Sequence, residues 1–215
     1  MRVARIITRL NIGGPAIQAV TLSERLSNRG FETLLIHGRL GAGEGDMRYV
    51  LSDERVQTRY VPALCRPIAP LQDAIALTQV SRLLRAFRPA IVHTHMAKAG
   101  TIGRLAALVY NRTAGRPAPA RVVHTYHGHV LEGYFRPAVQ RAFTAAERQL
   151  ARASDAIVAI SPQIRNELLD DHRIGRPEQY RVIPLGFDLQ EGGVVGDHFG
   201  RCEPRIPNPE SRQCR

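Results

Sequence analysis

The stretch Val122-Val-His-Thr-Tyr-His-Gly-His129 points to the fold, because an apolar run ends there on two histidines that flank a glycine. Buried strands usually end on turn residues rather than on titratable rings. In open parallel α/β sheets, ligands bind in the crevice at the carboxyl ends of the strands. We therefore expect His127 and His129 to lie at a ligand site.

Two other expected strands end in comparable chemistry. The stretch Ala90-Ile-Val-His-Thr-His95 also ends on histidine, and an apolar run over Val3–Thr8 leads into Gly13 and Gly14 before an apparent helix. Because parallel strands end at the same edge of a sheet, these three strand ends predict a single site.

Short apolar runs alternate with longer helical patterns along the first 188 residues. The runs predict strands over Val3–Thr8, Thr33–His37, Val56–Val61, Ala90–Thr94, Arg121–His127, Ala156–Ile160 and Tyr180–Pro184. The patterns predict helices over Pro15–Arg29, Leu71–Phe87, Gly100–Tyr110, Arg136–Arg152 and Ser161–Asp170. This alternation favours an α/β fold with a doubly wound, parallel, Rossmann-like sheet. Residues 189–215 are rich in proline without a usable period, so we expect a disordered tail there.

Helical spacing also predicts which faces are buried. In the helix expected over Arg136–Arg152, the apolar side chains share one face, which is expected to be the core face: Val139, Ala142, Phe143, Ala146 and Leu150. Pro15 suits a first helical turn and Ser161 suits a helix cap.

Composition limits the compartment and the partners. The chain has 215 residues, 44% of them hydrophobic, and a formal charge of +11 that comes almost wholly from arginine. The arginines are scattered, so we expect a solvated cationic surface and no nucleic-acid partner. Three cysteines without a C-x-x-C pair favour a reducing, cytoplasmic location. No apolar stretch approaches the ~20 residues of a membrane span, so membrane contact would be peripheral, at the inner face.

Several enzyme classes lack their sequence signatures here. The loop Asn11-Ile-Gly-Gly-Pro15 is not G-x-G-x-x-G, and His37-Gly-Arg39 stands where a dinucleotide site has an acidic residue. The chain contains neither a G-x-x-x-x-G-K-[ST] phosphate loop nor a G-x-S-x-G nucleophile elbow. These absences disfavour nicotinamide-dependent dehydrogenases, P-loop enzymes and serine hydrolases of the α/β type.

Four positions could contact a ligand near the first and fourth strands. Gly13 and Gly14 allow backbone to approach a diphosphate at a helix N-terminus, or they form an ordinary tight turn. His95 projects on the same side as His93, nearer the crevice, and His93 reads as a hydrogen-bonded core imidazole. Nothing near the pair supplies a carboxylate or thiolate, so no metal is expected. Lys98, the only lysine, could contact a phosphate or carboxylate, or be an isolated surface cation.

The segment His127-Gly128-His129 is the strongest local signal. A neutral imidazole can accept a proton or hydrogen-bond a sugar hydroxyl, and Gly128 leaves room for a substrate. The alternative is a satisfied pair of histidines at a turn. We favour the functional interpretation.

Five segments in one order carry a family resemblance. They are Ile6-Ile-Thr8 with Gly13-Gly14, Val92-His-Thr-His-Met-Ala-Lys-Ala-Gly-Thr-Ile-Gly-Arg-Leu-Ala106, His124–His129, Ala156-Ile-Val-Ala-Ile-Ser-Pro162 and Val182-Ile-Pro-Leu-Gly-Phe-Asp188. Together they resemble the N-terminal Rossmann-like domain of family 4 glycosyltransferases of the GT-B architecture. The resemblance is greatest to bacterial members that act in polysaccharide or lipid-linked glycan synthesis.

The resemblance implies sugar transfer from a nucleotide diphosphate donor to a glycan or lipid-linked acceptor, with retention of configuration and without a metal or other cofactor. It implies a catalytic-site position for His127, near the transferred sugar, and contact of Gly13 and Gly14 with the donor diphosphate. For the acceptor side it points to His95, Lys98, Gly128 and His129. The partners would be a nucleotide sugar and the acceptor.

The second, nucleotide-binding domain of the family does not follow Asp188, after which only 27 residues remain. We expect residues 1–188 to form the acceptor-side domain and the chain to be a truncated copy that is inactive alone. Two alternatives stay open. One is half of a nucleotide-sugar 2-epimerase, and the other is a non-enzymatic remnant that binds a glycan, a membrane or a partner.

Overall fold

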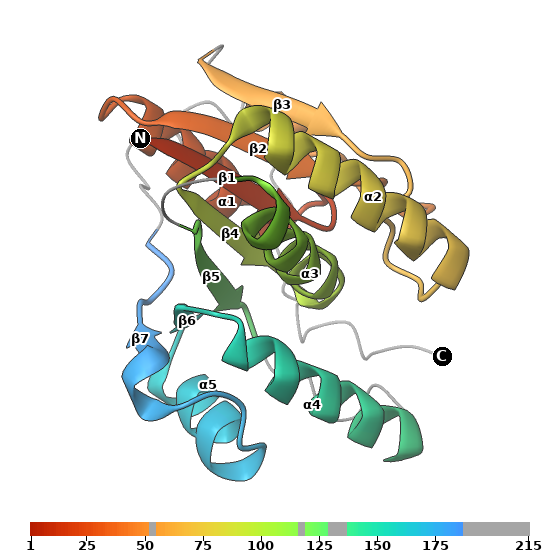
Figure 1. Cartoon of the computed structure of the whole chain (residues 1–215), viewed down its shortest axis with the longest axis vertical. Coiled ribbons are helices and arrows are strands. Elements are labelled where there is room, and N and C mark those ends of the chain that lie inside the picture. Colours follow the sequence, from red (N-terminus) through yellow and green to blue (C-terminus); the bar gives the residue numbers. More distant parts are fainter. Residues whose placement is uncertain (52–54, 116–118, 129–136, 187–215) are drawn as a thin grey trace, which may run out of the picture. The chain divides into compact units, whose positions relative to one another are not determined.

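A seven-stranded parallel sheet forms the centre of the computed structural model, which describes residues 1–51, 55–115, 119–128 and 137–186. The strand order is β3-β2-β1-β4-β5-β6-β7 (Figure 1). The strands are β1 (Arg2–Ile7), β2 (Glu32–His37), β3 (Val56–Tyr60), β4 (Ile91–His95), β5 (Arg121–Tyr126), β6 (Ala156–Ala159) and β7 (Tyr180–Val182). The predicted doubly wound sheet is confirmed, with all seven strands within a few residues of their expected bounds.

Within the described residues, five α-helices connect these strands. They are α1 (Gly14–Ser27), α2 (Pro70–Phe87), α3 (Ala97–Thr113), α4 (Pro137–Arg152) and α5 (Pro162–Asn166), and a π-helical turn over Glu167–Asp171 extends α5. Short 3₁₀ turns occupy Arg48–Val50 and Pro177–Gln179. Pro15 lies in the first turn of α1, and the Ser161 hydroxyl accepts a hydrogen bond from the Ile164 N–H at 3.2 Å. Both helix-start predictions are therefore confirmed.

The two faces of the sheet carry different layers. Helices α2 and α3 pack on one face, where Val80, Leu84 and Ala106 meet Ile6 and Val92. Helix α1 packs on the opposite face, through residues that include Ala16, Ala19 and Val20 against Ile7 and Leu35. Figure 1 shows α2 and α3 on the near side of the sheet and α1 on the far side. Both faces of the central strands are covered, which explains their continuous apolar runs.

The buried face of α4 agrees with the prediction only in part. Leu150 is buried and Phe143 packs against the core, as predicted, but Ala142 and Ala146 are exposed and Thr144 and Glu147 are buried instead. The cause is an ion pair: Arg104 of α3 donates from Nη2 to both carboxylate oxygens of Glu147, at 2.7 and 2.8 Å. An apolar-periodicity argument assigns charged residues to solvent, so it misplaced the face that contains Glu147.

Some expectations fall outside the described residues. These are the disordered tail over 189–215 and the position of His129. Within the described part of the chain, no helix is both long and apolar enough to cross a membrane.

Candidate functional site

The order of the sheet reverses between β1 and β4, and this is where parallel α/β sheets bind ligands. In the parallel register, Ile7 pairs with His37 on one side and His95 on the other, and His95 pairs with Thr125. Paired residues of adjacent strands point to the same face, so these side chains form one row on the α1 face. The row lies at the carboxyl end of the sheet, as the sequence predicted.

A cluster of three histidines and one arginine lies on this face. The Arg5 Nη1 donates to His93 Nδ1 at 3.1 Å and to His95 Nε2 at 3.3 Å. His95 Nδ1 lies 2.9 Å from His127 Nε2, and His93 Nε2 lies 2.7 Å from the Thr125 hydroxyl. The His93 and His95 rings are 4.3 Å apart. The prediction that His93 and His95 project alike is confirmed, and His93 is the hydrogen-bonded imidazole that was expected.

All three imidazoles of the cluster are held neutral. Burial, followed by the charge of Arg5, keeps the pKa of His93 well below its usual value. Burial is also the main cause for His95, whose pKa is likewise far below the usual range, and for His127, whose pKa is lowered to about 4. Burial lowers the pKa of the Arg5 guanidinium to about 9, so it stays protonated at neutral pH. The cluster therefore holds one cation among neutral rings.

A cavity of about 600 Å³ opens at the carboxyl ends of β1 and β4. Its walls include Thr8, Arg9, Arg66, Ile68 and Lys98. Arg9 pairs with Glu44 at 2.7 Å, and the Lys98 ammonium donates to Asp73 at 2.6 Å. With two of its three cations already paired, the cavity carries little unbalanced positive charge.

Met96 connects the histidine cluster to this cavity. It directly follows His95 and lines the cavity, with φ 66° and ψ 160°. Backbone of this kind is almost confined to glycine, and other residues keep it only where their surroundings enforce it. The Met96 carbonyl accepts the Gly100 N–H at 2.7 Å, and the Thr8 hydroxyl accepts the Ala99 N–H at 3.1 Å. These bonds hold the turn in which β4 becomes α3.

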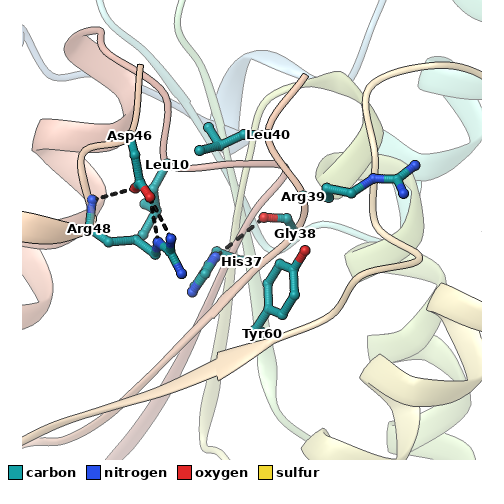
Figure 2. A pocket seen from close by; sticks show the side chains of 8 residues that line it. All are labelled: Leu10, His37, Gly38, Arg39, Leu40, Asp46, Arg48 and Tyr60. Atoms are coloured by element: carbon teal, nitrogen blue, oxygen red, sulfur yellow. Dashed lines mark hydrogen bonds and ion pairs between the residues drawn. The ribbon is translucent and has the colours of Figure 1, made fainter. Parts of the chain in front are cut away.

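A second cavity, of about 200 Å³, lies at the ends of β2 and β3 (Figure 2). Figure 2 shows the His37 ring between Tyr60 and the paired side chains of Asp46 and Arg48. Burial is the main cause that lowers the pKa of His37. In the sequence, His37 was noted only because it stands where a dinucleotide-binding site has an acidic residue. Its position at a strand end, like that of His127, was the signal that could have identified it.

The predicted site residues divide into groups. His95 and His127 are in contact, and Lys98 lines the cavity that begins one residue beyond His95. A Cβ built on Gly128 would meet no described heavy atom within 4 Å, which agrees with the room expected there. Gly13 caps α1 at the same edge of the sheet, but neither Gly13 nor Gly14 lines the two cavities described here. The roles assigned to these residues remain predictions.

No sequence pattern identified Arg5 as a candidate site residue. It lies in the middle of an apolar strand, and the residue is only 2% exposed. Because it occupies nitrogen lone pairs of His93 and His95, those lone pairs are not available to a metal cation. The side chains around Arg5 are therefore better suited to hydrogen bonding with a ligand than to coordinating a metal ion.

Comparison with known proteins identifies the family of this fold. The model of Glycosyltransferase Family 4 matches residues 12–191. A galactosyltransferase of Escherichia coli, UDP-Gal:alpha-D-GlcNAc-diphosphoundecaprenol alpha-1,3-galactosyltransferase, is 32% identical over 139 residues. That match covers 65% of this chain and 34% of the relative. The chain thus spans about a third of that enzyme.

Solved structures share the fold at low identity. Sucrose-phosphate synthase from Thermosynechococcus elongatus matches with a TM-score of 0.63 and 16% identity, over 87% of this chain and 49% of that one. UDP-GlcNAc 2-epimerase from Methanocaldococcus jannaschii matches with a TM-score of 0.55 and 14% identity, over 85% and 45%. In both cases the chain spans less than half of the solved protein.

Proposed function

Because this chain belongs to glycosyltransferase family 4, we propose that it forms the acceptor side of a sugar-transfer site of the GT-B type. In this proposal a sugar passes from a nucleotide diphosphate donor to a glycan or lipid-linked acceptor, with retention of configuration and without an essential metal ion. The observation that carries the proposal is the hydrogen bond between His95 and His127 at the strand-order reversal, where a cavity begins one residue after His95.

The cavity suits a hydroxyl-rich acceptor better than a free polyanion. The ion pairs of Arg9 with Glu44 and of Lys98 with Asp73 offer both donors and acceptors, as sugar hydroxyls require. Ile68 and Met96 supply apolar wall on which a sugar ring can pack. Arg66 adds one positive charge, which favours an acceptor that carries a phosphate group.

Binding of an acceptor analogue tests this assignment. The full 215-residue chain would be titrated with a water-soluble GlcNAc-diphosphate alkyl ester, chosen from the acceptor named for the E. coli relative. We expect Lys98→Met to weaken binding about tenfold, because a charge-assisted hydrogen bond contributes roughly 1.5 kcal/mol. Arg82→Met, on the exposed side of α2, is the matched control. Equal affinity of Lys98→Met and Arg82→Met would contradict the assignment.

Transfer itself needs groups beyond this half of the site. Stabilisation of a departing diphosphate requires several preorganised donors or cations. The cavity supplies Arg66, with Arg9 and Lys98 committed to carboxylates. We therefore expect the purified chain with UDP-galactose and acceptor to give little or no product. Robust transfer by the chain alone would overturn this part of the proposal.

The same donor and acceptor distinguish a transferase from the alternative, a nucleotide-sugar epimerase. An epimerase changes the sugar of the nucleotide donor without any acceptor, whereas a transferase does not. Chromatography of the donor after incubation with the chain and a complementary nucleotide-binding domain distinguishes the two. An acceptor-dependent change supports transfer.

We also propose that the beginning of α2 touches a membrane surface peripherally. Ile68, Leu71 and Ile75 are exposed by 70, 75 and 40%, and Ile68 lines the acceptor cavity. An acceptor with a lipid chain would bring this edge to the bilayer.

We expect the protein to float with anionic vesicles and to float less in the double variant Ile68→Asp, Leu71→Asp. The control Val109→Asp changes an exposed apolar residue of α3. If about 0.5 M salt alone abolishes flotation and the double variant floats normally, the apolar contact is wrong.

A further inference from the structure

Arg5 is a buried cation for which no described residue supplies a carboxylate. Its Nε donates to the Ser23 hydroxyl at 3.1 Å, and its Nη1 donates to His93 and His95. A guanidinium has only donors, so each of these partners must act as an acceptor. A buried charge is tolerated only where its hydrogen bonds are made.

This one-way donation assigns the protons on the neighbouring rings. His95 Nε2 accepts from Arg5, so a neutral His95 carries its hydrogen on Nδ1. His95 Nδ1–H then donates to His127 Nε2 at 2.9 Å. By the same argument His93 accepts at Nδ1 and donates from Nε2 to the Thr125 hydroxyl. The hydrogen-bond network therefore requires Nδ1–H on His95 and Nε2–H on His93.

The chain of donation ends at His127. Its Nε2 lone pair is occupied by His95, so the neutral ring carries its hydrogen on Nδ1. His127 Nδ1 is buried, and it has no hydrogen-bond partner among the described residues. An unpaired buried donor costs about 1–3 kcal/mol, which a ligand oxygen would recover. The lowered pKa of His127, about 4, agrees with a ring that stays neutral.

We propose that Arg5, acting through His95, is a positioning residue that fixes His127 as a hydrogen-bond donor at Nδ1 toward an oxygen of the substrate. This rests on the proposed function for the identity of the substrate. The ligand group is a hydroxyl, carbonyl or phosphate oxygen. Since both nitrogens of His127 are committed, one to His95 and one to a proton, the ring orients the substrate and does not remove a proton from it.

The tautomers can be measured in the ligand-free 215-residue chain by two-bond ¹H–¹⁵N correlation of labelled histidines. The protonated and bare nitrogens of a ring resonate far apart, and His95→Gln and His127→Gln assign the signals. We expect Nδ1–H for His95 and His127 and Nε2–H for His93. An Nε2–H ring at His95 or His127 would overturn the proposal. No sugar is present, so the result stands whether or not the transferase assignment holds.

A pair of variants tests the part played by Arg5. In Arg5→Met the constraint on His95 is removed, so the His127 signals should shift to a mixture of both tautomers. Ser23→Ala is the matched control, because it removes the Arg5 Nε acceptor and keeps both bonds to histidine. Unchanged tautomers in a folded Arg5→Met protein would refute the role of Arg5. If that variant does not fold, the wild-type spectrum decides.

Discussion

Two buried arginines, on opposite faces of the same sheet, are balanced in different ways. Arg104, on the face covered by α3 and α4, is fully buried and donates to both oxygens of Glu147, which also accepts from the Tyr126 hydroxyl. Arg5, on the α1 face, has only neutral acceptors. Burial alone would lower the pKa of both, but the Glu147 charge raises that of Arg104, whereas that of Arg5 falls to about 9. The paired charge of Arg104 suits a structural role, and the unpaired charge of Arg5 is the one to which we assign a positioning role at the proposed site.

The largest effect is expected for Arg104→Met. It leaves the Glu147 carboxylate buried without its cation, which typically costs about 3–5 kcal/mol. Urea denaturation would measure the free energy of unfolding. The double variant Arg104→Met, Glu147→Leu should recover much of the loss, because no buried charge remains. If Arg104→Met were as stable as wild type, the structural role of Arg104 would be refuted.

Arg5→Met should destabilise less than Arg104→Met. It leaves two imidazole nitrogens without donors, at a cost of about 1–3 kcal/mol, but it leaves no uncompensated charge. The same denaturation series compares the two substitutions directly. If Arg5→Met lowered the free energy of unfolding more than Arg104→Met, the main role of Arg5 would be structural.

The third effect is a pH dependence that arises from the neutral histidines. In the unfolded chain an imidazole protonates below about pH 6.5. In the folded protein His127 stays neutral down to about pH 4, so the unfolded state binds more protons between these values. Stability should therefore fall as the pH falls through this window, by up to roughly 1.4 kcal/mol per pH unit for each such histidine.

His127→Gln should reduce this pH slope by about one proton, as measured by thermal unfolding from pH 7 to pH 4.5. His93, His95 and His124 have pKa values lowered in the same direction, so a slope remains in the variant. A slope unaltered by the substitution would mean that His127 titrates normally.

The smallest effect calibrates the others. Ser161→Ala removes the cap on α5, away from both arginines, and should cost about 1 kcal/mol in the same denaturation assay. It reports what an ordinary local hydrogen bond contributes in this fold. Arg5→Met should exceed it. A cost for Arg5→Met below that of Ser161→Ala would show that the Arg5 bonds to histidine contribute little.

The same contrast explains what could be predicted from the sequence. Apolar period and turn residues predicted every strand, because both faces of a parallel sheet must be covered. His95 and His127 were predicted to share a site because parallel strands end at one edge. These inferences depend on patterns that are local along the chain.

The partners of buried charges are not local. Arg5 and His93 are 88 residues apart, and Arg104 and Glu147 are 43 apart. Hydropathy assigns both arginines and Glu147 to solvent, so the buried face of α4 was predicted only in part and Arg5 was missed. Only the register of β1 with β4 reveals that Arg5 lies beside His93.

The conformation of Met96 has an energetic consequence for whatever occupies the adjoining cavity. A non-glycine residue with φ 66° and ψ 160° retains strain of about 1–3 kcal/mol. The rest of the fold offsets this strain before a ligand binds. Binding therefore does not have to distort the cavity wall at Met96. Met96→Gly should therefore relieve this strain and leave a less rigid cavity wall, while it removes the packing of Met96 against the core on the α1 face. At Met96, a less strained backbone would therefore come with a cavity wall that is less well ordered for binding.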